Sequence, residues 1–291
     1  MGEFKIGVVG DLHTHWDDID VHQFDQSPYD LIFFTGDLGG GTPDSTVRVA
    51  RTISKLSKPA LVMPGNNDTI DTAELAAELT HRAGIAALSE MRARPTDRAE
   101  SRPHVQVCGY STHRYQRDGE LDVTLVTGRP HSMGGPELSF PDYMHESYGI
   151  RSLQESQDRL MSLVEDTKSE QLIFLSHNGP NGLGGDPLDI WGADFKAGGG
   201  DWGDPDLTAA IDYAVASHKQ VLAVIAGHMH VKTKSGEDRT WRTRAAGIEY
   251  VNAARVPRIF SGHDDVHRHH LSVSVRPGEV NIAEVLLPQT S

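Results

Sequence analysis

Side chains that can bind metal ions follow five short apolar segments of this sequence. The segments are KIGVVG, LIFFTG, ALVMPG, QLIFLS and VLAVIAG, and the side chains that follow them are Asp11, His13, Asp37, Asn66, His177, His228 and His230. Runs of about four to eight residues rich in Val, Ile, Leu and Phe are typical of buried strands. In α/β sheets the carboxyl ends of the strands form the edge where sites lie, so we expect these side chains to converge.

This ligand set suits two divalent transition-metal ions. One ion would be held by Asp11, His13, Asp37 and His230, and the other by Asp37, Asn66, His177 and His228, with Asp37 bridging. Nitrogen and oxygen donors without thiolate favour Mn, Fe, Zn, Co or Ni over Ca, and of these we favour Mn. Two such ions about 3.5–4 Å apart activate water and clamp a phosphoryl group during in-line displacement.

Each of these side chains, taken alone, has a simpler explanation. Asp and His tolerate the turns that end strands, and GNN is itself a good turn sequence, which makes Asn66 the weakest ligand by chemistry. His228 and His230 alternate with one intervening residue, so both imidazoles would point to one side of an extended segment. The recurrence of such residues after successive apolar runs favours metal binding over isolated turns.

Strand-like and helix-like segments alternate along most of the chain. A further apolar run spans 121–128, and helical patterns cover 43–56, 72–83, 152–164 and 206–216. This alternation predicts an α/β layered fold, here a single domain over 1–291. Near the end the pattern changes, and alternating residues around Pro277-Gly278 predict a β-hairpin at about 269–288. The segment 178–203 holds nine glycines and is expected to be an irregular loop.

Composition restricts the partners and the compartment. The chain has 291 residues, with 27 Lys and Arg against 41 Asp and Glu, so its net charge is −14. Such a charge repels nucleic acid at long range, and no apolar run is long enough to span a membrane. A single cysteine excludes a disulfide framework, and the N-terminus shows no export signal, so we expect a cytoplasmic protein.

Five motifs in order resemble those of the calcineurin-like metallophosphoesterase family. They are GDLH at 10–13, GDLG at 36–39, GNND at 65–68, SHNGP at 176–180 and GHMH at 227–230. The resemblance covers most of the chain. It implies a four-layer α-β-β-α sandwich of two mixed sheets, with a site for two metal ions at one end.

The sequence departs from the family pattern at Asn67. Family members usually carry a His there, which contacts the phosphate and helps the leaving group depart. An amide donates hydrogen bonds but cannot act as a general acid near pH 7, so we expect Asn67 to steady a phosphate oxygen and Asp68 to support the turn. GDLGGG and GNND also lack the Arg and Glu of the protein Ser/Thr phosphatases. The resemblance therefore implies the phosphodiesterase-like branch.

Three further side chains are weaker catalytic candidates. His15 follows His13 by two residues and is either a proton donor or an exposed loop residue. Arg129 and His131 follow the apolar run at 121–128, and only this position suggests that they approach a phosphate.

Other unusual residues have plain explanations as alternatives. Trp191 and Trp202 either stack on an aromatic group of the substrate or hold the glycine-rich segment in place. The four histidines of 263–270 are expected in a solvated loop.

We therefore expect a metal-dependent phosphoesterase that hydrolyses a small-molecule ester, with a phosphodiester favoured, by a metal-activated hydroxide. Two alternatives remain open. One is a metal-binding scaffold with weak turnover, and the other is a phosphomonoesterase or protein phosphatase.

Overall fold

A computed structural model describes residues 2–68, 104–262 and 265–288. The predicted helix at 72–83 lies outside these residues. Among the described helices, none is both long and apolar enough to cross a membrane.

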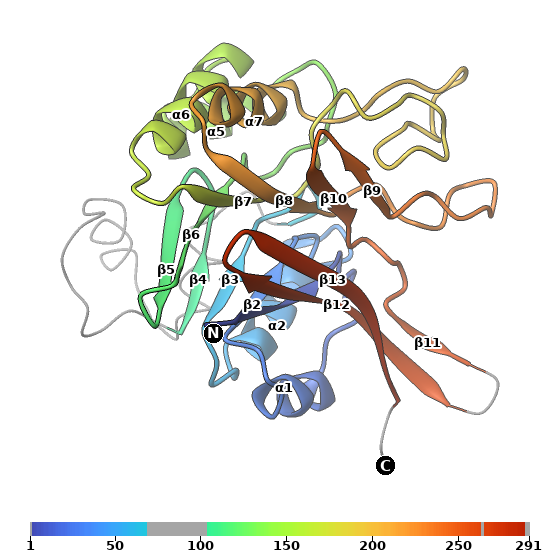
Figure 1. The fold of residues 1–291 in the computed structure, drawn as a ribbon. Coiled ribbons are helices and arrows are strands. Elements are labelled where there is room, and N and C mark those ends of the chain that lie inside the picture. The colour runs from blue at the N-terminus through green and yellow to red at the C-terminus, as the bar shows by residue number, and fades with distance from the viewer. Residues whose placement is uncertain (1, 69–103, 263–264, 289–291) are drawn as a thin grey trace.

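The first sheet contains the chain's beginning and its end (Figure 1). Its strands run in the order β11-β12-β1-β2-β3-β4. Strand β13 pairs with β12 along the edge that faces away from β1 and β11. The strands β1 to β4 are parallel, whereas β12 runs antiparallel to its three neighbours. The bounds are β1 Phe4–Val9, β2 Leu31–Phe34, β3 Ala60–Val62, β4 Val105–Val107, β11 Ile259–Ser261, β12 Val266–Arg276 and β13 Glu279–Pro288.

The second sheet is built from the middle of the chain. Its order is β5-β6-β7-β8-β10-β9, in which β6, β7, β8 and β10 are parallel and the two edge strands are antiparallel to their neighbours. The bounds are β5 Thr112–Arg117, β6 Leu121–Thr127, β7 Gln171–Leu175, β8 Gln220–Ala226, β9 Arg242–Ala245 and β10 Ile248–Asn252.

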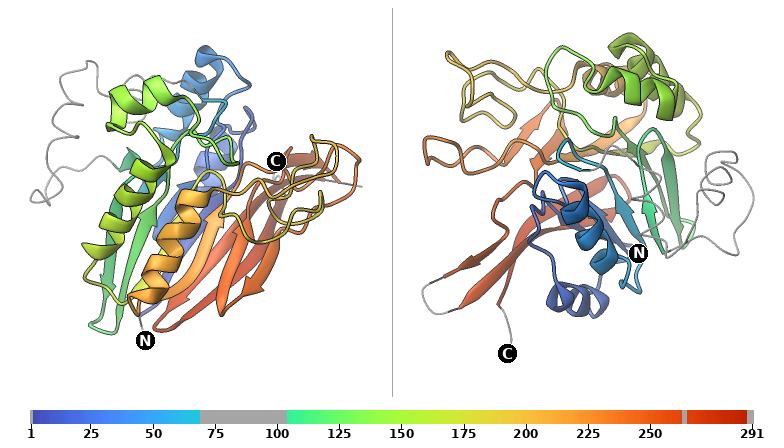
Figure 2. Two further views of the ribbon diagram at one scale, coloured as in Figure 1. Left: turned by 90° about the horizontal axis from the view of Figure 1, so that it is seen from above. Right: turned by 180° about the vertical axis from the view of Figure 1, so that it is seen from behind.

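Helices cover the outer faces of both sheets. Figure 2 shows α6 and α7, in lime and gold, lying along the strands of the second sheet. On the first sheet, α1 and α2 occupy the corresponding face (Figure 1). The bounds are α1 Asp18–Asp25, α2 Pro43–Ile53, α5 Pro141–Tyr148, α6 Leu153–Glu165 and α7 Pro205–Ala216.

Alternating side chains of the strands fill three separate apolar cores. In β2, Phe33 packs between the two sheets, and Phe34 packs against α1 and α2. In β7, Ile173 enters the same core between the sheets, and Phe174 packs against the helices on the second sheet. Three cores separate four layers, because successive residues of a strand point to opposite faces. The predicted four-layer sandwich of two mixed sheets is confirmed.

The end of the chain forms a longer hairpin than its sequence suggested. Strands β12 and β13 pair from His267 with Pro288 to Arg276 with Glu279. His269 and His270 are buried at 2% and 1% exposure, so the prediction of a solvated loop is wrong for them. The cause is tertiary packing, since β12 lies between β13 and β1, and His270 Nε2 lies 2.7 Å from Tyr29 Oη.

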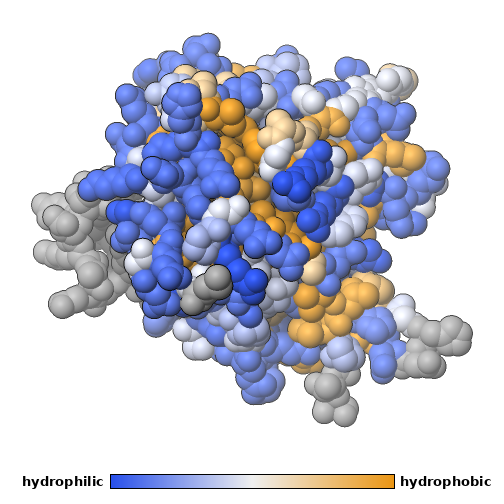
Figure 3. Space-filling model, viewed as in Figure 1, coloured by the Kyte–Doolittle hydropathy of each residue, from blue (hydrophilic) through white to orange (hydrophobic). Residues whose placement is uncertain are grey.

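The molecular surface in the view of Figure 3 is mostly hydrophilic, as the charged composition requires. An apolar area lies at the lower right, over strands β12 and β13. Leu286 of β13 is one of the few large apolar side chains that are about half exposed in the described residues.

Candidate metal centre

The candidate ligands lie at the carboxyl ends of strands from both sheets. They follow β1, β2 and β3 in the first sheet and β7 and β8 in the second. Parallel pairing within each sheet brings these ends to one edge. There, two groups of three side chains each hold their ligand atoms within 4.8 Å of one another. The groups are Asp11, His13 and His230, and Asp37, His177 and His228.

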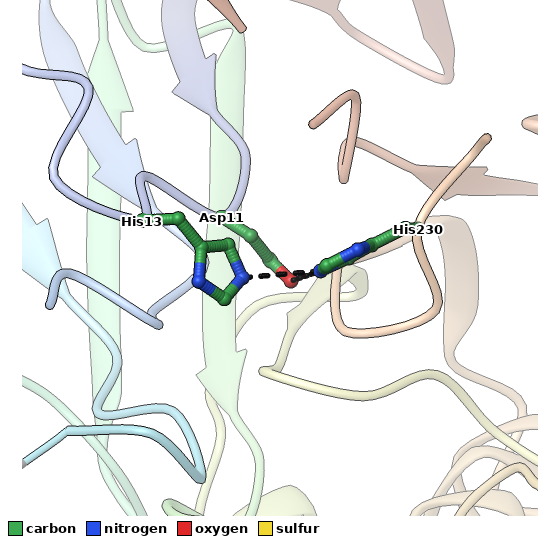
Figure 4. A group of neighbouring side chains, drawn as sticks. All are labelled: Asp11, His13 and His230. Carbon is green, nitrogen blue, oxygen red and sulfur yellow. Dashed lines mark hydrogen bonds and ion pairs between the residues drawn. The ribbon is translucent and has the colours of Figure 1, made fainter. Parts of the chain in front are cut away.

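In the first group, two imidazoles and a carboxylate face each other (Figure 4). His13 Nε2 lies 3.1 Å from His230 Nε2, and His230 Nε2 lies 3.8 Å from Asp11 Oδ2. Asp11 is fully buried, and its Oδ1 accepts a hydrogen bond of 2.8 Å from Thr35 Oγ1. The side chain of His230 is 40% exposed, so this group is open to solvent on one side.

The second group is more deeply buried and gains an amide oxygen. His177 has no exposed surface, and its Nε2 lies 3.6 Å from Asp37 Oδ1 and 3.0 Å from Asn66 Oδ1. The rings of His177 and His228 have centroids 5.0 Å apart. Asn66 thus brings an amide oxygen beside this group, and its role as a ligand stays a prediction.

Asp37 connects the two groups. Its Oδ1 faces His177 of the second group, and its Oδ2 lies 3.6 Å from His13 Nε2 of the first. One carboxylate thus offers one oxygen to each group. This is the arrangement that a bridging ligand needs.

Backbone carbonyls fix which nitrogen of each buried imidazole is free. His177 Nδ1 donates to the carbonyl of Thr35 at 2.7 Å, which turns Nε2 toward Asp37. Burial alone would lower the pKa of this imidazole, but the charges of Asp37 and Asp11 raise it. His228 Nε2 donates to the carbonyl of Met133 at 3.2 Å, which leaves Nδ1 free. Metal-binding histidines commonly donate their second N–H in this way, and the contact fixes the tautomer and the ring orientation.

Electrostatic interactions keep Asp37 charged although it is buried. Burial alone would raise its pKa, but the nearby His177 and His228 and the hydrogen bonds from Asn67 hold the pKa of this carboxyl below its usual range. Burial, together with the neighbouring His177, lowers the pKa of His228 to about 4. At neutral pH the site therefore presents a carboxylate and a neutral imidazole, which are the forms that bind metal.

Three candidate ligands have an uncommon backbone conformation. His13, Asp37 and His228 have φ values of 40°, 48° and 68°. Left-handed φ values in residues other than glycine are sparsely populated and cluster at functional sites. Nearby, Gly65 permits close approach, because a Cβ atom there would lie 2.2 Å from Asp37 Oδ1.

Asn67 and Asp68 hold the loops of the site together. Asn67 donates twice to Asp37, from its backbone N at 2.8 Å to Oδ1 and from Nδ2 at 2.7 Å to Oδ2. The buried Asp68 accepts from the backbone N–H groups of Leu38 and Gly65, and so joins the GDLG and GNND segments. Burial and the charge of Asp37 raise the pKa of Asp68 to about 7. The side chain of Asn67 thus contacts a candidate bridging ligand, and its contact with a phosphate stays a prediction.

Arg129 does not have the environment predicted for it. Its guanidinium is buried and lies 3.0 Å from both Asp204 Oδ1 and Asp206 Oδ2. Asp204 in turn accepts a hydrogen bond of 2.6 Å from Ser132 Oγ, next to Met133. Arg129 therefore supports the segment that orients His228 rather than facing a phosphate.

The two remaining histidine candidates contact the backbone of site loops. His131 is fully buried, and its Nδ1 donates to the carbonyl of Gly65 at 3.0 Å. His15 is partly buried, and its Nδ1 lies 2.9 Å from the carbonyl of His13. Both histidines lie beside the candidate ligands, and their predicted part in catalysis stays a prediction.

Sequence reasoning missed the supporting residues. Thr35 contacts two candidate ligands, through its hydroxyl to Asp11 and its carbonyl to His177. Met133 and Asp204 act through a backbone carbonyl and a buried ion pair. A backbone carbonyl leaves no mark in the residue type, and only the position of Thr35 immediately before the GDLG motif could have indicated it.

The donor set fits divalent transition-metal ions. The two groups contain imidazole nitrogens, carboxylate oxygens and an amide oxygen, without thiolate. The Nε2 atoms of His13 and His230 lie 3.1 Å apart, close enough for both to bind one cation. Such mixed N and O donors suit Mn, Fe, Zn, Co and Ni.

Comparisons with known proteins agree with this description. The family model of the calcineurin-like phosphoesterases matches residues 4–232. No curated protein matches the sequence. One solved crystal structure is 12% identical, with 98% of this chain and 99% of that chain covered and a TM-score of 0.54, which supports the fold. A structure of PhoD is 9% identical, over 100% of this chain and 72% of that chain, with a TM-score of 0.45. A predicted phosphoesterase from Streptococcus pneumoniae TIGR4 is 12% identical, over 98% of this chain and 99% of that chain, with a TM-score of 0.32. The chain belongs to the calcineurin-like phosphoesterase family, whose members are metal-dependent hydrolases of ester bonds.

Proposed function

We propose that this chain hydrolyses a phosphodiester at a centre that holds two divalent transition-metal ions, with Mn favoured. The position of Asp37 carries the proposal, because one of its oxygens faces each ligand group at 3.6 Å. Asp11, His13, Asp37 and His230 would hold one ion, and Asp37, Asn66, His177 and His228 the other. Bound there, the ions would supply water activation and charge neutralisation on the phosphoryl oxygens.

The chain's own residues hold and orient this centre. The carbonyls of Thr35 and Met133 fix the tautomers of His177 and His228. Asn67 fixes both oxygens of Asp37 by hydrogen bonds. Preorganised ligands of this kind do not need to rearrange during the reaction, which favours catalysis over mere metal storage.

One observation favours a diester over a monoester, and a second concerns the leaving group. A monoester dianion brings one more negative charge than a diester, yet Arg129 is neutralised by Asp204 and Asp206. Asn67 cannot supply a proton to a departing oxygen. His131 is poorly suited as a substitute, because its Nδ1 proton is bound to the carbonyl of Gly65 and burial lowers its pKa to about 4. We therefore expect good turnover only with esters whose leaving group needs no proton.

The experiment compares bis(p-nitrophenyl) phosphate with p-nitrophenyl phosphate on Mn-loaded protein, together with elemental analysis. We expect two ions per chain and a higher kcat/KM for the diester. His228→Ala should abolish most turnover without unfolding the chain, and the exposed His145 of α5 provides the matched control, His145→Ala. Full metal loading without turnover of either ester would favour the scaffold alternative, and a faster monoester would contradict the diester assignment.

A further inference from the structure

Two of the few exposed large apolar side chains lie beside the metal centre. In the described residues such side chains are Met133, Phe195, Val215 and Leu286, each about half exposed. Met133 and Phe195 both adjoin the indole of Trp202. Trp202 Nε1 donates to the Met133 carbonyl at 2.8 Å, and the rings of Trp202 and Phe195 meet edge to face with centroids 5.1 Å apart. We call Met133, Phe195 and Trp202 the aromatic rim.

The aromatic rim is attached to both ligand groups. The Met133 carbonyl that accepts from Trp202 also accepts from His228 Nε2 at 3.2 Å, so the indole and this imidazole share one oxygen. On the other side, Arg239 Nε donates to the carbonyl of His230 at 3.1 Å. The same guanidinium lies 3.5 Å from the carboxylate of Asp194, the residue before Phe195. These contacts hold the rim at a fixed distance from the candidate ligands.

Two lysines add positive charge to this apolar surface. Lys196 Nζ lies 5.5 Å from the centre of the Trp202 ring, and Lys234 Nζ lies 5.8 Å from that of Phe195. Neither ammonium group forms an ion pair with a carboxylate in the parts of the chain that the structure describes. The two ammonium groups lie over adjacent aromatic rings, and in a chain of net charge −14 they provide positive charge to which an anionic group could be drawn.

We propose that the aromatic rim binds the organic group of the ester and selects a planar ring that carries a second anionic group. This inference rests on the proposed function. A flat apolar ring would contact Phe195, Trp202 and Met133, because aromatic rings gain from such contacts beyond the area that they bury. The second anion would lie near Lys196 and Lys234 while the phosphoryl group lies at the metal centre. The rim would thus add a preference for substrate shape and charge that the metal ligands alone do not provide.

The test measures binding of three phosphonates to the Mn-loaded protein by titration calorimetry. Methylphosphonate, phenylphosphonate and 4-carboxyphenylphosphonate share the metal-binding group and differ only in the ring and the second anion. We expect phenylphosphonate to bind at least about fivefold more tightly than methylphosphonate. The carboxylate should add roughly a further two- to fivefold. Phe195→Ala should remove the first gain, and the double variant Lys196→Gln/Lys234→Gln should remove the second.

Matched control variants lie elsewhere on the surface. Val215 of α7 and Lys168 have exposed side chains of the same kinds, so Val215→Ala and Lys168→Gln should leave all three affinities unchanged. Equal binding of the three phosphonates, or gains that survive in the rim variants, would overturn the inference. If methylphosphonate itself fails to bind in the presence of Mn, the proposed function fails first. If methylphosphonate binds but the ring and carboxylate add nothing, only the inference about the rim fails.

Discussion

Replacing Arg129 by Met tests whether this residue supports the site rather than binding a phosphate. The guanidinium is the cation of a buried cluster in which the side chains of Arg129, Asp204 and Asp206 are each at most 1% exposed. Removing it leaves two buried carboxylates without a counter-charge. Loss of one partner of a buried ion pair typically costs about 3–5 kcal/mol. We expect the free energy of unfolding of Arg129→Met to fall by this amount at pH 8.

The loss of unfolding free energy in Arg129→Met should be smaller in acid, because Asp204 becomes protonated there. Burial raises the pKa of this carboxyl to about 6, although Arg129 opposes the rise. A carboxyl with a raised pKa in the folded state destabilises the fold as pH rises through the interval between its unfolded and folded values. Without Arg129 that pKa rises further, so protonation at pH 5 relieves part of the repulsion that persists at pH 8.

Urea unfolding at pH 5 and pH 8 provides the measurement. Arg114→Met is the matched control, because Arg114 pairs with Asp122 at the surface, where an ion pair contributes little to stability. A loss below about 1 kcal/mol for Arg129→Met at both pH values would refute the reasoning. Unchanged stability with a selective rise in KM would instead restore the role of Arg129 in phosphate binding.

Three other predictions concern the leaving group, the metal ions and acid stability. Asn67→His should raise rates on alkyl esters more than rates on aryl esters, because general acid catalysis contributes about 10²–10⁴-fold. The measurement is a series of esters with different leaving groups on both proteins. If the rate of the unmodified protein depends only weakly on the pKa of the leaving group, the prediction is contradicted. Elemental analysis after Mn loading should give two ions per chain. Asp37→Asn should bind fewer ions, because it removes the ligand shared by both groups. One ion in the fully loaded wild type would refute the dinuclear centre. Burial lowers the pKa values of His269 and His270 to about 3, so the fold loses stability as pH falls from about 6.5 toward 3, by up to about 1.4 kcal/mol per pH unit for each residue. The double variant His269→Gln/His270→Gln should flatten this part of the urea-derived stability profile, and an unchanged slope would mean that these histidines are protonated in the folded state.

The strands that precede the motif residues could be predicted from the sequence, because buried strands have a strong local signature. QLIFL and VLAVIA become β7 and β8 almost residue for residue. The predicted helix at 43–56 is α2, Pro43–Ile53, with the proline in its first turn. Short helices were missed, among them α1, whose capping box of Asp17 and Asp20 is a weak signal without an apolar stripe.

Long-range packing explains what the sequence could not show. The burial of His270 depends on Tyr29, a residue 241 positions away. Arg129 is neutralised by carboxylates more than 70 positions further along the chain. Neither pairing has a local pattern, so a basic residue after a strand looks like a phosphate ligand until its partners are known.

The division of each ligand group between the two sheets affects the stability of the folded chain. Asp11 and His13 come from the first sheet and His230 from the second, and the other group is divided in the same way. Bound ions would therefore cross-link the two sheets of the sandwich. An ion that binds only the folded state adds about 2.7 kcal/mol of stability when its free concentration is 100 times its dissociation constant. Loss of the bound ions would thus lower resistance to proteolysis as well as turnover.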